Sequence, residues 1–497
     1  MRAFCTFLIT AGSLFLAGCG STSATPPVSL TPPMPQILNA GETLNITAAV
    51  TNDPSKKGVS WSLSPSTGTL ANETSTSVIY QAPDTVTGNF TVTVTAAAAA
   101  DSSKTAPLVI TVLAPGQGNL HPVSVENGPV AGELYLNFPL TSVLVCEHGT
   151  SICQVIGGIL VDTGSSGLRI LKSALNINLP PLTQSGGTVN NCISFVGQQF
   201  QWGEVAPADV YLAGESAIGI SVQIIADPVG FTIPANCTNG GADADTQLVF
   251  PANGILGIGT EPTDCTFAGV NPCDPSSGSN PSLPYFVCFD GQGCAPTLLP
   301  QAQQVTNPIA AFAHDNNGSI LEFPAVGTAL PTVNGTLTFG INTQLNNALS
   351  NATVFAIGDD FFTTIFEGQP LTKSFIDSGS NELVFPNLTG IPGCSDGHSY
   401  CPASPIVLTA GNQGAQGVGT GSVTFQVDNF ETEVAGNPED AAFEYIAAGA
   451  EERTPCQNGQ GDCMFDWGLP FFFGRKVFTS IDTEIVANQP KTPWWAY

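Results

Sequence analysis

ILVDTGSSGLRI, at residues 159–170, begins as an apolar strand and stops at an acid. Ile159 to Val161 lead into Asp162, and the Thr-Gly-Ser-Ser that follows cannot extend a packed strand. A carboxylate at the end of a buried run is costly unless it is paired or hydrogen-bonded. A second stretch, SFIDSGSNELVF at residues 374–385, repeats the pattern around Asp377. The two acids are therefore predicted to form one site.

The two acids are also followed, further along the chain, by similar apolar stretches that contain a glycine. The first is followed by NGILGIG, which contains Gly257, and the second by FDWGLPFFFG, which contains Gly468. The distance along the chain from acid to glycine is nearly the same in both cases. An Asp-Ser/Thr-Gly triplet alone is a common turn, because Asp caps its own backbone and Gly accepts positive φ. The matched pair with matched sequels instead indicates an internal duplication.

These motifs make the chain from about residue 120 to 497 resemble the pepsin-like aspartic endopeptidases, most clearly within residues 130–485. The resemblance implies a bilobal, all-β, pepsin-like fold in which Asp162 and Asp377 are catalytic. It also implies that two hydroxyls tie the two loops together, that two others bond the outer carboxylate oxygens, and that two glycines allow close backbone approach. In that order these supporting residues are Thr163 and Ser378, Ser165 and Ser380, and Gly164 and Gly379.

The residue types suit amide hydrolysis without a metal. Two carboxylates at about 3 Å cannot both ionise easily, so one holds a proton while the other activates water. We therefore predict an aspartic endopeptidase that cleaves an extended peptide or protein substrate between two β lobes, with no cofactor and no metal. The alternatives are a catalytically silent pepsin-like binding protein and a structural or adhesive surface protein.

Two positions depart from the family pattern. The family has a tryptophan after the first motif, which bonds a tyrosine on a hairpin flap; here Arg169 stands in its place. The flap region, residues 192–214, has Phe195 and Val196 nearest the tyrosine position, and Tyr211 falls too late. Either the flap is built differently, or the lobe does not close on peptides.

The N-terminus predicts export. Arg2 precedes an apolar run that ends in Leu-Ala-Gly-Cys, which resembles a bacterial lipobox. Residues 1–18 are therefore expected to be a lipoprotein signal peptide and Cys19 the lipidated residue. The chain would be anchored to the bacterial cell envelope through this lipid only. An ordinary signal with an incidental cysteine is the alternative.

The remaining domain boundaries follow from composition. Residues 19–35 are a Ser/Thr/Pro-rich tether, and residues 36–114 show short alternating runs typical of an immunoglobulin-like β-sandwich, with Trp61 as its expected core tryptophan. The first lobe of the peptidase-like part is placed at residues 120–328 and the second at residues 329–497. We expect a monomer.

The net charge and the cysteines give information on the possible ligands and on the disulfides of the protein. The chain has 39 acidic and 11 basic residues, so no basic patch is available for nucleic acid. Its 14 cysteines in an exported chain predict disulfides, with metal binding as the weaker alternative. Close spacing predicts the pairs Cys146–Cys153, Cys394–Cys401 and Cys456–Cys463, with Cys192–Cys237 as a further candidate. Local pairs are favoured for the four cysteines Cys265, Cys273, Cys288 and Cys294.

Overall fold

The computed structural model describes residues 28–497 except 32–35, 40–42, 52, 54–55, 84–89, 114–117, 131–134, 196–198, 227–230, 239, 267–269, 280–283, 451–455, 457–462, 483 and 492. The predicted signal peptide and Cys19 lie outside the described residues. Strands dominate the described chain, and its α-helices are two short segments, α1 (Ala235–Thr238) and α2 (Phe430–Gly436). The predicted all-β class is confirmed. Among these residues, no helix is long and apolar enough to cross a membrane.

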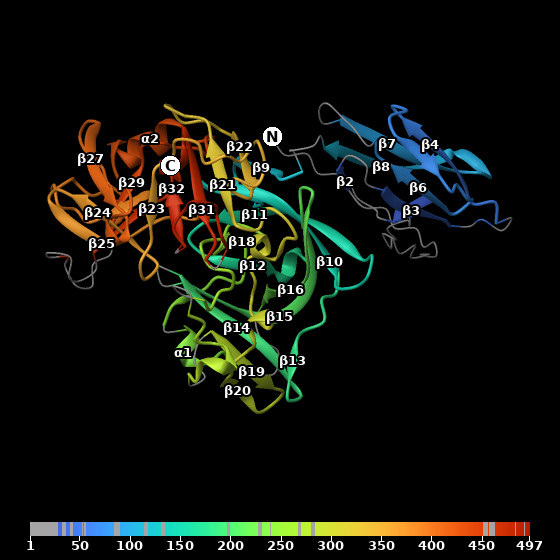
Figure 1. The fold of residues 1–497 in the computed structure, drawn as a ribbon, viewed down its shortest axis with the longest axis horizontal. Coiled ribbons are helices and arrows are strands. Elements are labelled where there is room, and N and C mark those ends of the chain that lie inside the picture. Colours follow the sequence, from blue (N-terminus) through green and yellow to red (C-terminus); the bar gives the residue numbers. More distant parts are fainter. Residues whose placement is uncertain are drawn as a thin grey trace, which may run out of the picture.

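The N-terminal part is a β-sandwich, drawn in blue in Figure 1. One sheet has the order β1-β3-β6-β5 and the other β2-β8-β7-β4. Alternate residues of β7, such as Val92, Val94 and Ala96, point into the shared core and are fully buried. The strands are β1 (Val28–Thr31), β2 (Gln36–Asn39), β3 (Thr43–Val50), β4 (Val59–Ser64), β5 (Thr69–Ala71), β6 (Ser77–Gln81), β7 (Phe90–Ala98) and β8 (Asp101–Leu113).

Two sequence predictions for this part need correction. The tether was expected to run to residue 35, but Val28–Thr31 pairs with β3, because alternation buries Val28 and Leu30 in the sandwich core. Trp61 is not at the centre of that core. It is partly buried at the margin and donates its indole N–H to Thr74 O at 2.9 Å, whereas Tyr80 is fully buried.

A closed sheet takes up most of the remaining strands. It contains β9 (Leu120–Val125), β10 (Pro139–Glu147), β11 (Cys153–Asp162), β12 (Ser166–Leu171), β13 (Thr183–Gln184), β14 (Gly187–Phe195), β15 (Gln199–Leu212), β16 (Glu215–Ile225), β17 (Ala242–Asp243), β18 (Gly254–Ile258), β19 (Tyr285–Phe289), β20 (Gly293–Pro296), β21 (Gly318–Phe323), β22 (Val333–Phe339), β23 (Val354–Ala356), β31 (Arg475–Ser480) and β32 (Trp494–Ala496).

A separate seven-stranded sheet, drawn in orange in Figure 1, has the order β28-β27-β24-β25-β30-β26-β29. Its strands are β24 (Phe362–Phe366), β25 (Gln369–Ile376), β26 (Leu383–Phe385), β27 (Ile406–Gln413), β28 (Thr420–Val427), β29 (Ala447–Gly449) and β30 (Met464–Trp467). We call residues 139–296 the first half and residues 362–467 the second half. Each half contains one of the two Asp motifs.

The strands between the halves come from three parts of the chain. β9 pairs with β22, β22 with β21, β21 with β31, and β31 with β32. The lobe boundary that we placed at residues 328/329 falls between β21 and β22, which are neighbours in this shared sheet. The C-terminal strands therefore belong to the junction of the halves and not to the second half alone.

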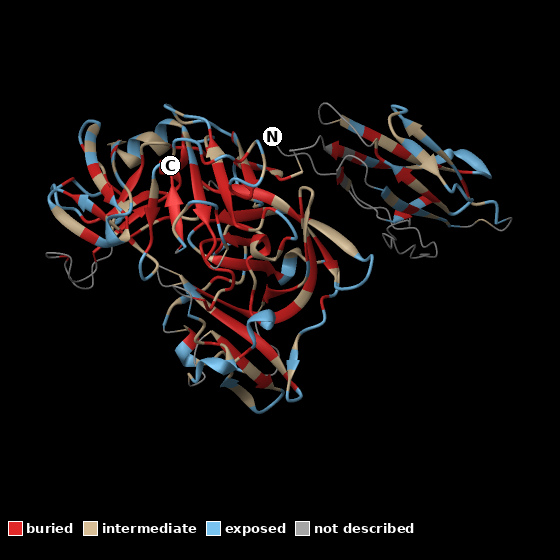
Figure 2. Cartoon of the chain, viewed as in Figure 1, coloured by how far each residue is buried: buried red, intermediate tan, exposed pale blue. Residues whose placement is uncertain are grey.

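The two halves repeat one local topology. In the first, β18 pairs parallel with β11 and antiparallel with β12. In the second, β30 pairs parallel with β25 and antiparallel with β26. Each Asp therefore lies at the end of a strand flanked by an apolar-Gly strand. One buried apolar cluster runs through both halves, and buried residues fill the centre of the molecule in Figure 2.

Six disulfides are formed among the described residues. They include the four predicted pairs, and the remaining cysteines form the local pairs Cys265–Cys273 and Cys288–Cys294. Most close loops of six to eight residues. Cys192–Cys237 differs, because it joins β14 to α1 across a sequence separation of 45.

We predict that this long-range disulfide contributes most to stability. Closing a loop of that length in the unfolded chain corresponds to roughly 4 kcal/mol, against about 2.5 kcal/mol for Cys146–Cys153. Alanine at Cys192 and Cys237 should therefore lower the free energy of unfolding in denaturant more than alanine at Cys146 and Cys153. Equal losses in the two double variants would contradict the prediction.

Candidate active site

The two acids stand at equivalent strand ends. β11 ends at Asp162, and Asp377 directly follows β25. In the first half Asp162 lies opposite Gly257 of β18. In the second half Ile376 lies opposite Trp467 of β30, so that the same register brings Asp377 level with Gly468. The duplication seen in the sequence is therefore a duplication of strand register.

Glycine is required where the apolar-Gly strands pass behind the loops. A Cβ on Gly257 would lie 2.8 Å from the carbonyl carbon of Ser166. A Cβ on Gly468 would lie only 2.0 Å from the carbonyl oxygen of Glu382. Real Cβ atoms do not approach backbone atoms so closely. Only a residue without a side chain therefore lets each loop pack directly against its strand.

Reciprocal hydrogen bonds tie the two Asp loops together. The N–H of Ser378 donates to Thr163 Oγ1 at 2.9 Å, and the N–H of Thr163 donates to Ser378 Oγ at 3.1 Å. The two hydroxyls then donate across the junction, from Thr163 to Ile376 O at 3.0 Å and from Ser378 to Val161 O at 2.7 Å. Thr163 and Ser378 are buried, so water competes little for these contacts.

The loops bring the carboxyl groups face to face. A Cβ on Gly164 would overlap the carboxyl group of Asp377, and a Cβ on Gly379 would come within 2.9 Å of Asp162 Cγ. Each glycine thus makes room for the carboxyl group of the opposite half. The structure brings together all eight residues that the sequence predicts for the dyad and its support.

Donors of its own loop surround Asp162. Its Oδ1 accepts from the N–H groups of Gly164 at 2.8 Å and Ser165 at 3.1 Å. Its Oδ2 accepts from the Ser165 hydroxyl. The side chain is buried with these three donors aimed at it, which orients the carboxylate and supplies charge-assisted hydrogen bonds to its ionised form.

Asp377 has a different environment. Its Oδ1 accepts from the Gly379 N–H at 2.7 Å, and its Oδ2 lies 2.9 Å from Ser380 Oγ. The dense protein around it raises the pKa of Asp377 well above its usual value, and the negative charges of Asp162 and Asp466 add to this rise. The two facing acids therefore favour a state in which the pair keeps one proton.

Asp466 is a third acid at the site, and the sequence analysis missed it. Its Oδ2 lies 2.6 Å from Ser380 Oγ, the same hydroxyl that contacts Asp377. Burial raises the pKa of Asp466 to about 8, the Ser380 hydrogen bond opposes this rise, and the charge of Asp162 adds to it. The sequence did contain an indication of this site, namely an acid within the apolar strand MFDW. An acid in an apolar run is the same feature that indicated Asp162.

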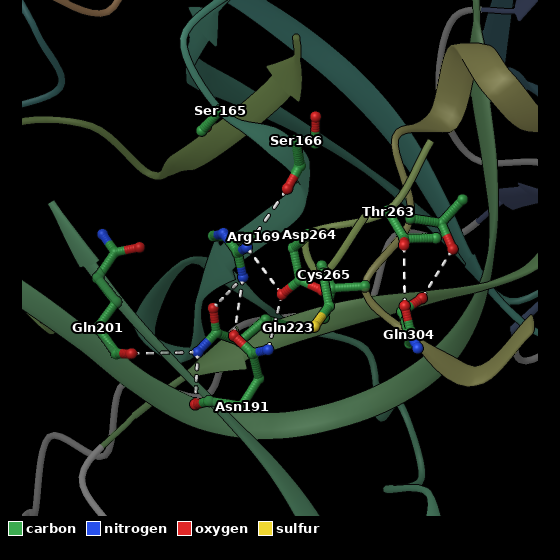
Figure 3. Close-up of polar contacts among 12 residues, drawn as sticks. Ser165, Ser166, Arg169, Asn191, Gln201, Gln223, Thr263, Asp264, Cys265 and Gln304 are labelled. Carbon is green, nitrogen blue, oxygen red and sulfur yellow. Dashed lines mark hydrogen bonds and ion pairs between the residues drawn. The ribbon is translucent and has the colours of Figure 1, made fainter. Parts of the chain in front are cut away.

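Arg169 is fully buried inside the first half, and its side chain points toward Asn191, Gln223 and Asp264 (Figure 3). Its guanidinium donates to Asn191 Oδ1 at 3.0 Å and Gln223 Oε1 at 2.6 Å, and it forms an ion pair with Asp264 at 3.1 Å. Burial raises the pKa of Asp264, against the lowering effects of Arg169, Tyr285 and Asn191. The cation is thus compensated locally.

The region predicted as the flap is a hairpin of β14 and β15, whose connection at residues 196–198 lies outside the described chain. Its other edge is occupied, because β14 also pairs with β19. Cys192 ties it to α1, and Asn191 joins it to Arg169. Arg169, at the position where a tryptophan was expected, therefore makes a polar contact between β12 and β14.

One set of metal-ligating side chains within 4.8 Å of one another was found in the described part of the chain, namely Cys394, Cys401 and Glu431. Its two sulfurs form a disulfide and are not available as thiolate ligands. The set therefore does not make a metal centre.

We predict that Arg169→Met strongly destabilises the protein, because it leaves Asp264 buried without its cation. Breaking one side of a buried pair costs about 3–5 kcal/mol. The control is Lys476→Met, which breaks the exposed pair with Glu322 and should cost at most about 1 kcal/mol. Denaturant unfolding of the two variants measures this difference, and similar small losses would contradict it.

Comparison with known proteins gives a family but no activity. A crystal structure of an aspartic proteinase from Irpex lacteus matches with 14% identity over 76% of this chain and 96% of that chain, at a TM-score of 0.39. This likeness is too distant to carry an argument. No curated protein matches the chain. The model of a family described as a protein of unknown function, DUF3443, matches residues 115–497, and the chain belongs to this family.

Proposed function

We propose that the protein is an aspartic endopeptidase that hydrolyses peptide bonds with Asp162, Asp377 and one activated water. The observation that carries this proposal is the pair of Asp loops, locked by the buried Thr163 and Ser378 so that their carboxyl groups face each other. A mere turn motif needs no such partner in the other half of the chain.

The two carboxyl groups would divide the chemistry. Asp162, with three hydrogen bonds to its oxygens, is suited to be the ionised partner that takes a proton from water. Asp377, whose pKa is raised, is suited to hold the proton that polarises the peptide carbonyl and later reaches the leaving amine. No covalent intermediate is needed.

The substrate class follows from the arrangement of the halves. Each half supplies one carboxyl group of the dyad, so we propose as substrate an extended peptide or unfolded protein segment that contacts both halves. Arg169 of β12, which contacts the hairpin of β14 and β15 through Asn191, departs from the family pattern and motivates the alternative of a peptide-binding protein without catalysis. Activity of the wild type decides between them.

We predict a bell-shaped pH dependence of kcat/KM for cleavage of a denatured protein. Activity is lost at low pH when both acids are protonated, and at high pH when the pair loses its last proton. Because the pKa of Asp377 is raised, the high-pH limb should lie above about pH 4, the ordinary carboxyl range.

Asp162→Asn and Asp377→Asn should each lower kcat/KM by roughly 10⁴-fold, and the double variant by little more, since the acids act as one unit. Asp428→Asn, at a buried acid of the second half that bonds Gln426, is the control and should keep activity. Undiminished cleavage by either dyad variant would sink the assignment. Peptide binding by an intact wild type that never cleaves would favour the binding protein.

We further propose that the chain is exported and anchored to the bacterial envelope through a lipid on Cys19, with the sandwich as an immunoglobulin-like spacer. Six disulfides support an oxidising compartment. The lipobox-like tetrad ending at Cys19 supports the anchor.

Detergent phase separation tests the anchor. The wild-type protein should partition into the detergent phase, whereas Cys19→Ala should be released or remain unprocessed. A wild-type protein found soluble in the medium would rule out lipid attachment.

A further inference from the structure

The Ser380 hydroxyl lies between two carboxyl groups. Its Oγ is 2.9 Å from Asp377 Oδ2 and 2.6 Å from Asp466 Oδ2. A serine hydroxyl carries one hydrogen, so it can donate to only one of these oxygens. The other contact at hydrogen-bond distance needs a proton on a carboxyl group. The geometry thus requires a proton on Asp377 or Asp466 in addition to the hydroxyl hydrogen.

Burial favours Asp466 as the place where this proton is kept. The side chain lies in β30, its residue is 5% exposed, and its Oδ1 has no hydrogen-bond partner among the described residues. A buried carboxylate with an oxygen that lacks a donor is costly, whereas a neutral carboxyl group is tolerated far better.

The first half shows that the fold does not need this acid. Ile255 of β18 occupies the place equivalent to Asp466, because both lie two residues before the glycine that passes behind the Asp loop. There the Ser165 hydroxyl donates to Asp162, and no second carboxyl group among the described residues bonds to it. The third acid is thus an addition to one half of a duplicated framework.

We propose that Asp466 is a positioning residue that stores a proton for the dyad and exchanges it with Asp377 through the Ser380 hydroxyl. In one direction Asp466 Oδ2–H donates its proton to Ser380 Oγ while the Ser380 hydroxyl passes its own proton to Asp377 Oδ2. Asp466 becomes a carboxylate, Asp377 becomes neutral, and Ser380 remains a hydroxyl. The total charge is unchanged and no other reactant is needed.

The groups that face Asp466 explain why the proton is retained. The end of β11 contributes Asp162, and the loop after β25 contributes Asp377. The negative charge of Asp162 raises the pKa of Asp466, and the negative charge of Asp466 raises the pKa of Asp377. An ionised Asp466 therefore makes loss of the dyad proton harder. The proton held by Asp466 would therefore extend the pH range in which the dyad is singly protonated, and so active, to higher pH.

Other neighbours do not offset these charges. The residues opposite Asp466 in the sheet are Phe375 on β25 and Val384 on β26, which do not titrate. Glu382, on the loop into β26, has its Oε2 3.6 Å from Nε2 of His398, which is charged only when the ring is protonated. No Lys, Arg or His in the described chain forms an ion pair with Asp466.

The kinetic test rests on the proposed peptidase function and compares Asp466→Asn with Asp466→Ile, the residue of the first half. We expect the high-pH limb of kcat/KM to move down by about one pH unit or more in both variants, because the charge that retains the dyad proton is gone. The low-pH limb should stay in place, and Asp428→Asn should move neither limb.

Asparagine keeps an N–H donor for Ser380 but cannot release a proton. If Asp466 only holds Ser380 in place, Asp466→Asn should retain the wild-type limb and Asp466→Ile alone should be impaired. That result would overturn the proton store. A uniform loss of activity at every pH, with both limbs unmoved, would overturn it as well.

A second measurement does not depend on activity, so it separates failure of this inference from failure of the proposed function. In protein labelled with ¹³C at aspartate carboxyls, we expect a resonance that titrates near pH 8 and is missing in Asp466→Asn. In the variant, Asp377 should titrate at lower pH than in the wild type. A wild type without such a resonance, or a variant that retains it, would overturn the proposal.

The sign of the pH effect on stability gives an independent check on the same proteins. Asp466 keeps a proton in the folded state that the unfolded chain releases above about pH 4, so the stability it confers is lost as pH rises toward about 8. The melting temperature should therefore fall less between these pH values in Asp466→Asn than in the wild type. An equal fall in both proteins would count against the store.

Discussion

The reciprocal hydrogen bonds between Thr163 and Ser378 are the contact on which the site depends. Two carboxyl groups repel each other when both are charged, so the two halves need an attractive contact to hold these groups close together. The buried hydroxyls couple each loop to the strand of the other half, through Ile376 and Val161. Because water is excluded there, loss of one partner leaves buried donors unpaired, which makes the junction a rigid one.

Around this junction the halves share a backbone framework and differ in their polar side chains. The first half places Arg169 and its ion pair with Asp264 within its core, whereas the register-equivalent position of the second half is Val384. The second half places Asp466 behind its loop, whereas the first has Ile255. The scaffold therefore tolerates a buried ionisable side chain in either half, and the environment of each dyad carboxyl group depends on which half contains it.

The asymmetry gives the two acids different environments despite equal motifs. Asp162 receives three hydrogen bonds from its own loop, and Asp377 lies between Asp162 and the Ser380 contact with Asp466. Desolvation and neighbouring negative charge raise the pKa of Asp377. The surroundings of the two acids, which differ between the halves, therefore decide which acid holds the proton, whereas the motifs themselves do not.

Local pattern in the sequence was enough to predict the all-β class, the pairing of close cysteines and the meeting of Asp162 with Asp377, because each depends on short-range alternation, loop length or a repeated motif. Contacts between distant segments that no repeated motif or cysteine pair marks were not predictable in this way. The burial of Arg169 against Asp264 and of Asp466 against Ser380 depends on which strands become neighbours. A single charged residue in an apolar strand indicates a partner, but only tertiary packing decides which one, since the pairing joins residues dozens of positions apart.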